Sequence, residues 1–209
     1  MAIRVSPTRM ELTRLKKRLK TAVRGHKLLK DKNDELVRTF ISFIRRNKEL
    51  REQVEASLAA AMGSAAIAKA KMGEESMTEA LMYPVSEAHA QVSTKNIMSV
   101  IVPQISFRPD GKEADLPYGF AFTPSELDTA VLDVAALLPQ LIELAGVEKT
   151  CDMLADEIEK TKRRVNALEH VSIPEMQEGI RAITMKLEEN ERANTTRLMK
   201  VKTMIADRN

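Results

Sequence analysis

The residue types that most often carry chemistry are few in this sequence and lie far apart along it. There are three histidines, His26, His89 and His170, and one cysteine, Cys151. A catalytic nucleophile needs a base and an orienting group at matched distances, and no spacing here supplies them. We interpret the histidines as structural or solvated residues and Cys151 as a buried or incidental thiol. We therefore expect no catalytic residue and no enzyme activity in this chain.

Cofactor and metal sites are not expected either. The seven glycines are scattered, so no glycine-rich loop is available to hold a phosphate. A single cysteine forms neither a disulfide framework nor a cysteine metal cluster, and it favours a reducing compartment. The N-terminus has no hydrophobic signal region, and Asp133 and Pro139 interrupt the longest apolar run, so we expect no direct membrane insertion.

Charge is the strongest chemical signal, and it is unevenly distributed. The net charge is only +3, yet residues 9–48 hold fourteen Lys and Arg against four Asp and Glu, and residues 110–160 hold three against twelve. The basic run at residues 14–20 fits a solvated helix face, the acidic surface of a partner protein, or nucleic acid. Aromatic side chains that stack on single strands are absent from it, which argues against nucleic acid.

Two heptad patterns must position these charges. In the first, eleven of fifteen seam positions are apolar, and no proline lies between Pro7 and Pro84. This predicts a coiled-coil helix over residues 1–72, with fifty-five residues spanning roughly 80 Å. Its seam positions are Leu12, Leu15, Leu19, Ala22, His26, Leu29, Asn33, Leu36, Phe40, Phe43, Asn47, Leu50, Val54, Ser57 and Ala61.

The second pattern predicts a long C-terminal helix within residues 124–209. We expect an interruption near residues 139–146, because Pro139 and Gly146 disfavour helix. The seam also takes a five-residue step from Leu168 to Ile173, so we expect a kink near residues 171–174, where Pro174 removes a backbone donor. Its later positions are Met176, Ile180, Ile183, Leu187, Asn190, Asn194, Arg197, Val201 and Met204.

The middle, residues 73–123, reads as a short helix followed by a β-hairpin. β-branched runs near Val100 and Ile105 and an aromatic run near Phe120 flank a Pro-Asp-Gly turn signal, which predicts that these runs pair. The fold class is therefore mainly α, an antiparallel two-helix coiled coil of the two terminal helices. Gly25 and Gly179 are predicted to face each other and permit close approach.

Several motifs resemble the D subunit of V-type and archaeal-type rotary ATPases. They are Pro7-Thr8-Arg9, the run of residues 25–32 (GHKLLKDK), residues 164–169 (RVNALE) before Ile173-Pro174, and residues 187–192 (LEENER). The motifs occur in the family's order and the match covers essentially the whole chain. The chain ends soon after the second seam, so a bacterial or archaeal complex is expected.

The resemblance implies a central-stalk rotor subunit that transmits torque on the cytoplasmic side of a membrane. The implied partners are the catalytic A and B subunits, the small F subunit, and the C subunit (called d in eukaryotes) above the membrane rotor ring. ATP chemistry and the transport of protons or sodium would belong to other subunits. Residues that would face the head are Arg4, Arg9, Arg14, Lys200 and Lys202, and residues near the F subunit would be Phe40, Arg45, Arg46, Arg163 and Arg164.

Two other classes of protein remain open from the residues alone. One is a coiled-coil scaffold or adaptor outside any ATPase, which would purify without nucleotide-binding partners. The other is a basic helical nucleic-acid binder, whose affinity would fall steeply as salt rises.

Overall fold

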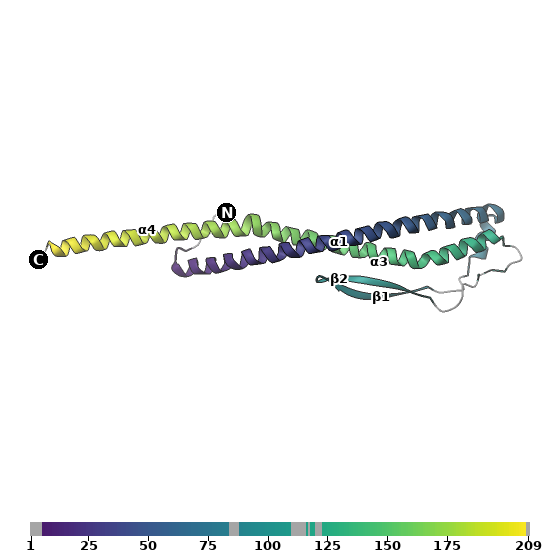
Figure 1. Cartoon of the computed structure of the whole chain (residues 1–209), viewed down its shortest axis with the longest axis horizontal. Coiled ribbons are helices and arrows are strands. Elements are labelled where there is room, and N and C mark those ends of the chain that lie inside the picture. The colour runs from purple at the N-terminus through teal and green to yellow at the C-terminus, as the bar shows by residue number, and fades with distance from the viewer. Residues whose placement is uncertain (1–5, 84–87, 110–115, 117, 120–122, 208–209) are drawn as a thin grey trace. The chain divides into compact units, whose positions relative to one another are not determined.

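The computed structural model describes residues 6–83, 88–109, 116, 118–119 and 123–207. Its long helices are α1 (Arg9–Met72), α3 (Ser125–Ala167) and α4 (Ile173–Ala206), with the short helix α2 (Glu74–Ala80) (Figure 1). A π-helical segment, η1 (Leu168–Ser172), joins α3 to α4, and β1 (Ala88–Ile97) pairs with β2 (Val100–Pro109). The predicted mainly α class, with long terminal helices and a small hairpin, is confirmed. Unit 1 comprises Met1–Glu35 and Ile158–Asn209, and unit 2 comprises Leu36–Glu157.

Local interactions define both ends of helix α1. Thr8 Oγ1 accepts a bond from the Glu11 backbone N–H at 3.2 Å, which satisfies one of the free donors of the first turn. At the other end Gly73 takes a φ of 86°, a left-handed conformation that favours glycine and stops the helix. The seam predicted along this helix is the face that is buried, and Leu36 at 0% and Val54 at 4% exposure are its most enclosed leucine and valine.

In unit 1, α1 packs against the C-terminal helices until Leu187. Leu15 and Ile183 are buried there, and Gly179 lies beside Leu15. A π-helical segment, η1, lies just before Pro174, in the region where a kink is predicted. A π turn adds one residue while the same face stays toward the partner helix, which accounts for the five-residue step in the seam.

In unit 2, α3 runs against residues 36–72 of α1. The predicted interruption at residues 139–146 is wrong, because α3 is continuous and carries Pro139 inside it. Burial of Leu137 and Val147 on either side outweighs the roughly 3 kcal/mol that proline costs a helix. Gly146 supports close packing instead: a Cβ there would lie 3.8 Å from Ile105 of the hairpin.

The hairpin exists, but its predicted pairing is wrong. Strand β2 pairs with residues 88–97 rather than with the aromatic run near Phe120. No Gly or Pro marks a turn between residues 88–97 and β2. Residues 120–122 of the aromatic run lie outside the described residues. The turn is Met98-Ser99, and both residues have positive φ (52° and 72°). Asn96 Oδ1 accepts a hydrogen bond from the Ser99 N–H at 2.8 Å. This bond stabilises a turn that contains no glycine.

One helical stretch meets the length and composition criteria for a membrane span. It lies in the continuous helix from Ser125 to Ala206, and 22% of it is buried. Core helices of soluble proteins can meet the same criteria. Its buried Ala130, Leu137 and Val147 belong to the two-helix core of unit 2.

Candidate partner-binding surfaces

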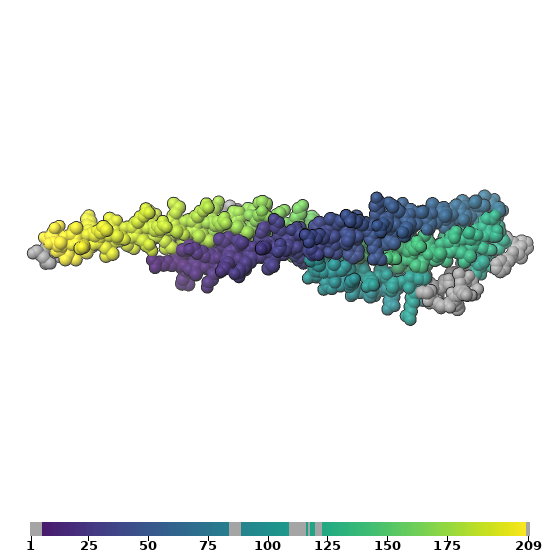
Figure 2. Space-filling model, in the orientation of Figure 1, coloured from purple at the N-terminus to yellow at the C-terminus, as the bar shows by residue number. Residues whose placement is uncertain are grey.

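The last three turns of α4 have no helix beside them among the described residues. Every residue from Glu188 to Asp207 is exposed, and Figure 2 shows this end of α4 uncovered, beyond the start of α1. Its apolar side chains recur at helical spacing: Leu198, Val201 and Ile205 are 70%, 51% and 58% exposed, with Met204 at 63%. An apolar stripe of this kind is typical of a surface that a partner covers.

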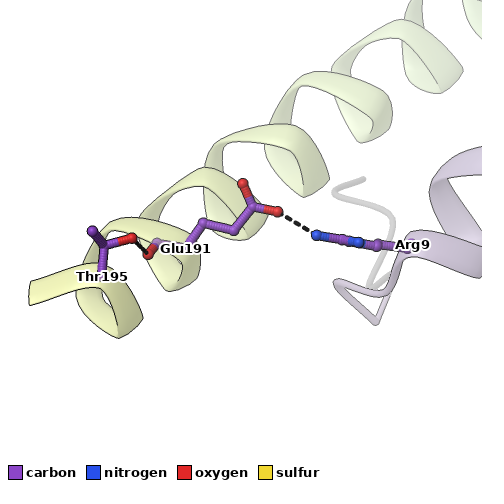
Figure 3. Close-up of polar contacts among 3 residues, drawn as sticks. All are labelled: Arg9, Glu191 and Thr195. Carbon is purple, nitrogen blue, oxygen red and sulfur yellow. Dashed lines mark hydrogen bonds and ion pairs between the residues drawn. The ribbon is translucent and has the colours of Figure 1, made fainter. Parts of the chain in front are cut away.

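Four of the five cations predicted to face the head lie among the described residues. Arg9 Nη2 lies 2.6 Å from Glu191 Oε1 on α4, while Thr195 bonds to the Glu191 backbone (Figure 3). Arg14 lies 3.6 Å from Glu11 on its own helix. Lys200 and Lys202 are exposed on the uncovered turns. Arg4 lies outside the described residues.

The structure divides the residues predicted to lie near the F subunit. Phe40, Arg45 and Arg46 belong to unit 2, whereas Arg163 and Arg164 belong to unit 1. Phe40 is half-buried, and Arg45, Arg163 and Arg164 are exposed. Two of these arginines form ion pairs with carboxylates. Arg46 pairs with Glu143 on α3, and Arg163 pairs with Glu159 one turn earlier in the same helix.

Sequence reasoning missed apolar residues beside Phe40. Ile41 and Ile44 are 44% and 43% exposed and lie one turn apart on α1, outside the seam. The available signal was their position between Thr39 and Arg45, where a solvated coiled-coil face would carry polar side chains. They make this part of α1 a candidate contact surface.

A third apolar surface lies where α1 gives way to α2. Met62 and Ile67 are 63% and 53% exposed, and Met82 and Tyr83 after α2 are 67% and 74% exposed. Small residues dominate this stretch of α1, and Ala61 and Ala68 are buried in its seam. A close helix pair with large exposed apolar side chains beside it is a further candidate docking surface.

The charge segregation seen in the sequence is partly neutralised inside unit 2. Arg46 pairs with Glu143, Arg51 Nη2 lies 4.0 Å from Glu148, and Lys71 pairs with Glu126. In each pair the cation is on α1 and the carboxylate is on α3. The hydrogen bond from Lys71 is the main reason that the pKa of the Glu126 carboxyl is lowered. These pairs favour the antiparallel alignment of the two helices.

The predicted contact between Gly25 and Gly179 is wrong. Gly179 lies beside Leu15, and a Cβ there would be 3.7 Å from Leu15 Cδ1. A Cβ at Gly25 would meet no atom within 4 Å, so substitution there closes no tight approach. The prediction placed Gly25 and Gly179 at the same level of the helix pair, whereas Gly179 lies beside Leu15 instead.

The structure assigns structural settings to several of the potentially reactive side chains. His26 Nε2 lies 3.1 Å from Glu169 Oε2 on η1, and His89 lies in β1. Cys151 is buried, and its burial, with Asp152 and Glu148 nearby, raises the pKa of its thiol. Within the described part of the chain, no three His, Cys, Asp or Glu side chains are grouped to hold a metal ion.

Comparison with known proteins agrees with these features. The family model described as the D subunit of ATP synthase matches residues 11–203. The V-type ATP synthase D subunit of Acetivibrio thermocellus is 57% identical over 210 residues, covering 99% of this chain and 95% of the relative. The proteins of that name from Clostridium novyi and a Thermoanaerobacter species are 53% and 52% identical, and each alignment covers 97% of this chain and at least 95% of the relative.

Proposed function

Because the chain belongs to the D-subunit family of ATP synthases, we propose that it is the central-stalk rotor subunit of a bacterial V-type ATPase or ATP synthase. It would turn within the catalytic A and B head and transmit torque to the membrane rotor ring. It would act on the cytoplasmic side of the membrane and take no part in the chemistry of ATP.

The uncovered end of α4 is the observation that most favours this role. A shaft that passes into a head must present side chains that the head can contact, and Leu198, Val201 and Ile205 form such a stripe. Lys200 and Lys202 beside it would meet acidic loops of the head. Since coupling arises only from differential contact energy between states, an asymmetric surface of this kind suits a rotor.

The other two apolar surfaces suit the remaining partners. We assign the surface of Ile41 and Ile44, next to Phe40, Arg45 and Arg46, to the small F subunit. We assign the surface around Met62, Met82 and Tyr83 to the C subunit. Both assignments rest on exposed apolar side chains within unit 2, and the identity of each partner comes from the family.

An affinity purification of the full chain from its own cells tests the role. The rotor role predicts that nucleotide-binding subunits co-purify, and that Leu198→Glu with Val201→Glu lowers ATP-driven ion pumping at least about tenfold. Thr203→Glu is the matched control, because helical spacing puts Thr203 on the opposite side of α4 from the stripe. Recovery of the chain without any nucleotide-binding subunit would support the adaptor class instead.

A further inference from the structure

The two outer edges of the hairpin differ in their backbone chemistry. The turn has two residues, so Ile97 and Val100, which flank it, exchange both of their hydrogen bonds. Hydrogen-bonded and non-hydrogen-bonded pairs then alternate along the ladder. The N–H and C=O groups of Val92 and Thr94 on β1 therefore point away from β2.

Proline supports this assignment and blocks one edge. Pro103 lies opposite Thr94, and a residue without an N–H fits only where that group would point outward. Pro109, opposite Ala88, falls at the same kind of position. The outer edge of β2 thus lacks donors at both places. The same strand also packs on α3, where Ile105 lies against Gly146.

The outer edge of β1 has none of these protections. Its ten residues contain no proline, its register with β2 is continuous from Ala88 to Ile97, and its side chains from His89 to Asn96 are exposed. At about 3.3 Å per residue it offers an edge roughly 30 Å long. Natural proteins normally protect such an edge with bulges, prolines, several charges or a covering element.

We propose that the outer edge of β1 binds an extended segment of another subunit of the ATPase by strand addition. The hairpin carries Lys95 and Arg108 and no Asp or Glu, so the incoming strand would present a carboxylate opposite Lys95. A second copy of this chain fits less well, because two acid-free hairpins would bring like charges together. The existence of partner subunits rests on the proposed function. The assignment of the β1 edge rests on the register and the prolines of the hairpin itself.

Residue-resolved hydrogen exchange on the purified complex and on the free full-length chain tests the proposal. Strand addition predicts that the outward amides of Val92 and Thr94 exchange at least about tenfold more slowly in the complex. The inward amides of Ser93 and Lys95, which bond to β2, should change little. Equal exchange of the outward amides in both states would overturn the proposal and leave the rotor role intact.

A backbone variant separates strand addition from side-chain contact. Thr94→Pro removes one outward N–H, as Pro103 does on β2, and should weaken partner binding about tenfold or more. Thr94→Ala keeps the N–H and should bind within about threefold of the natural chain, and Lys95→Glu should bind more weakly. Equal binding by Thr94→Pro and Thr94→Ala, with β2 amides still protected, counts against the proposal.

Two further outcomes of these experiments would point to different conclusions. Protection of Val92 and Thr94 in a dimer of the isolated chain would replace the proposed occupant with a second copy. Failure of the chain to join any ATPase subunit would contradict the proposed function itself.

Discussion

Arg9 on α1 lies 2.6 Å from Glu191 on α4, so a cation expected to face the head also joins the two ends of the chain. Both side chains are largely exposed, at 81% and 61%. An exposed pair contributes about 0.2–1 kcal/mol, too little to explain the position by stability alone. The pair leaves Arg9 accessible to an acidic partner.

A charge swap separates the two roles of Arg9. Arg9→Glu with Glu191→Arg retains an ion pair, so the free energy of unfolding should stay within about 1 kcal/mol of the natural chain. If Arg9 faces acidic loops of the head, the swap should still lower ATP turnover in the assembled complex, because it places a carboxylate there. Unchanged turnover would remove Arg9 from the head-facing set.

Burial in the seam predicts a large contrast between two leucines of α1. Leu36 is 0% exposed and Leu28 is 70% exposed. Leu36→Ala should lower the free energy of unfolding by about 2–5 kcal/mol, since it leaves a cavity between the helices. Leu28→Ala should change it by less than about 0.5 kcal/mol. Urea unfolding followed by circular dichroism measures both, and similar losses would mean that the seam is misplaced.

These two leucines also show how far the sequence could predict the fold. Leu28 is off the heptad seam and Leu36 is on it, so periodicity alone separated the buried residue from the exposed one. The same reasoning failed at Pro139, because burial on both sides of a proline depends on tertiary packing that propensity does not contain. It failed again at Met98-Ser99, because a turn supported by the side chain of Asn96 lacks the usual glycine.

The candidate surfaces were predicted less well than the helices. Basic residues near the ends were found from composition, but charge alone could not indicate that Arg46 and Arg163 already have carboxylate partners. Ile41 and Ile44 were missed because an apolar residue off the seam has no assigned role in a two-helix pattern. A partner surface on a coiled coil becomes visible only when the buried face is known.

Stability should depend on pH through Glu126. Lys71 lowers the pKa of this carboxyl below its ordinary value of 4.5, so the ionised form is favoured in the folded chain. The pair therefore stabilises the fold above the ordinary glutamate range, and this contribution is lost as pH falls through the lowered pKa. The difference in stability between the natural chain and Glu126→Gln should be present at neutral pH and shrink in acid. Glu75→Gln on α2 is the control, and a difference that persists in acid would contradict the linkage.

Cys151 should be unreactive in the native chain. Its thiol is buried, and its raised pKa keeps it protonated at neutral pH, so thiol reagents should react slowly until the protein unfolds. Ser76→Cys in a Cys151→Ala background is the control, because Ser76 is exposed on α2. Labelling of Cys151 as fast as that of the control would show that this part of α3 opens readily.

The same exposed cysteine provides the most direct test of the rotor role. A bead attached to Ser76→Cys in an immobilised complex of the full chain with the nucleotide-binding subunits alone can be followed by microscopy while ATP is hydrolysed. The rotor role predicts that the bead turns in one direction, in steps that depend on ATP concentration. A complex that hydrolyses ATP while the bead stays fixed would contradict it.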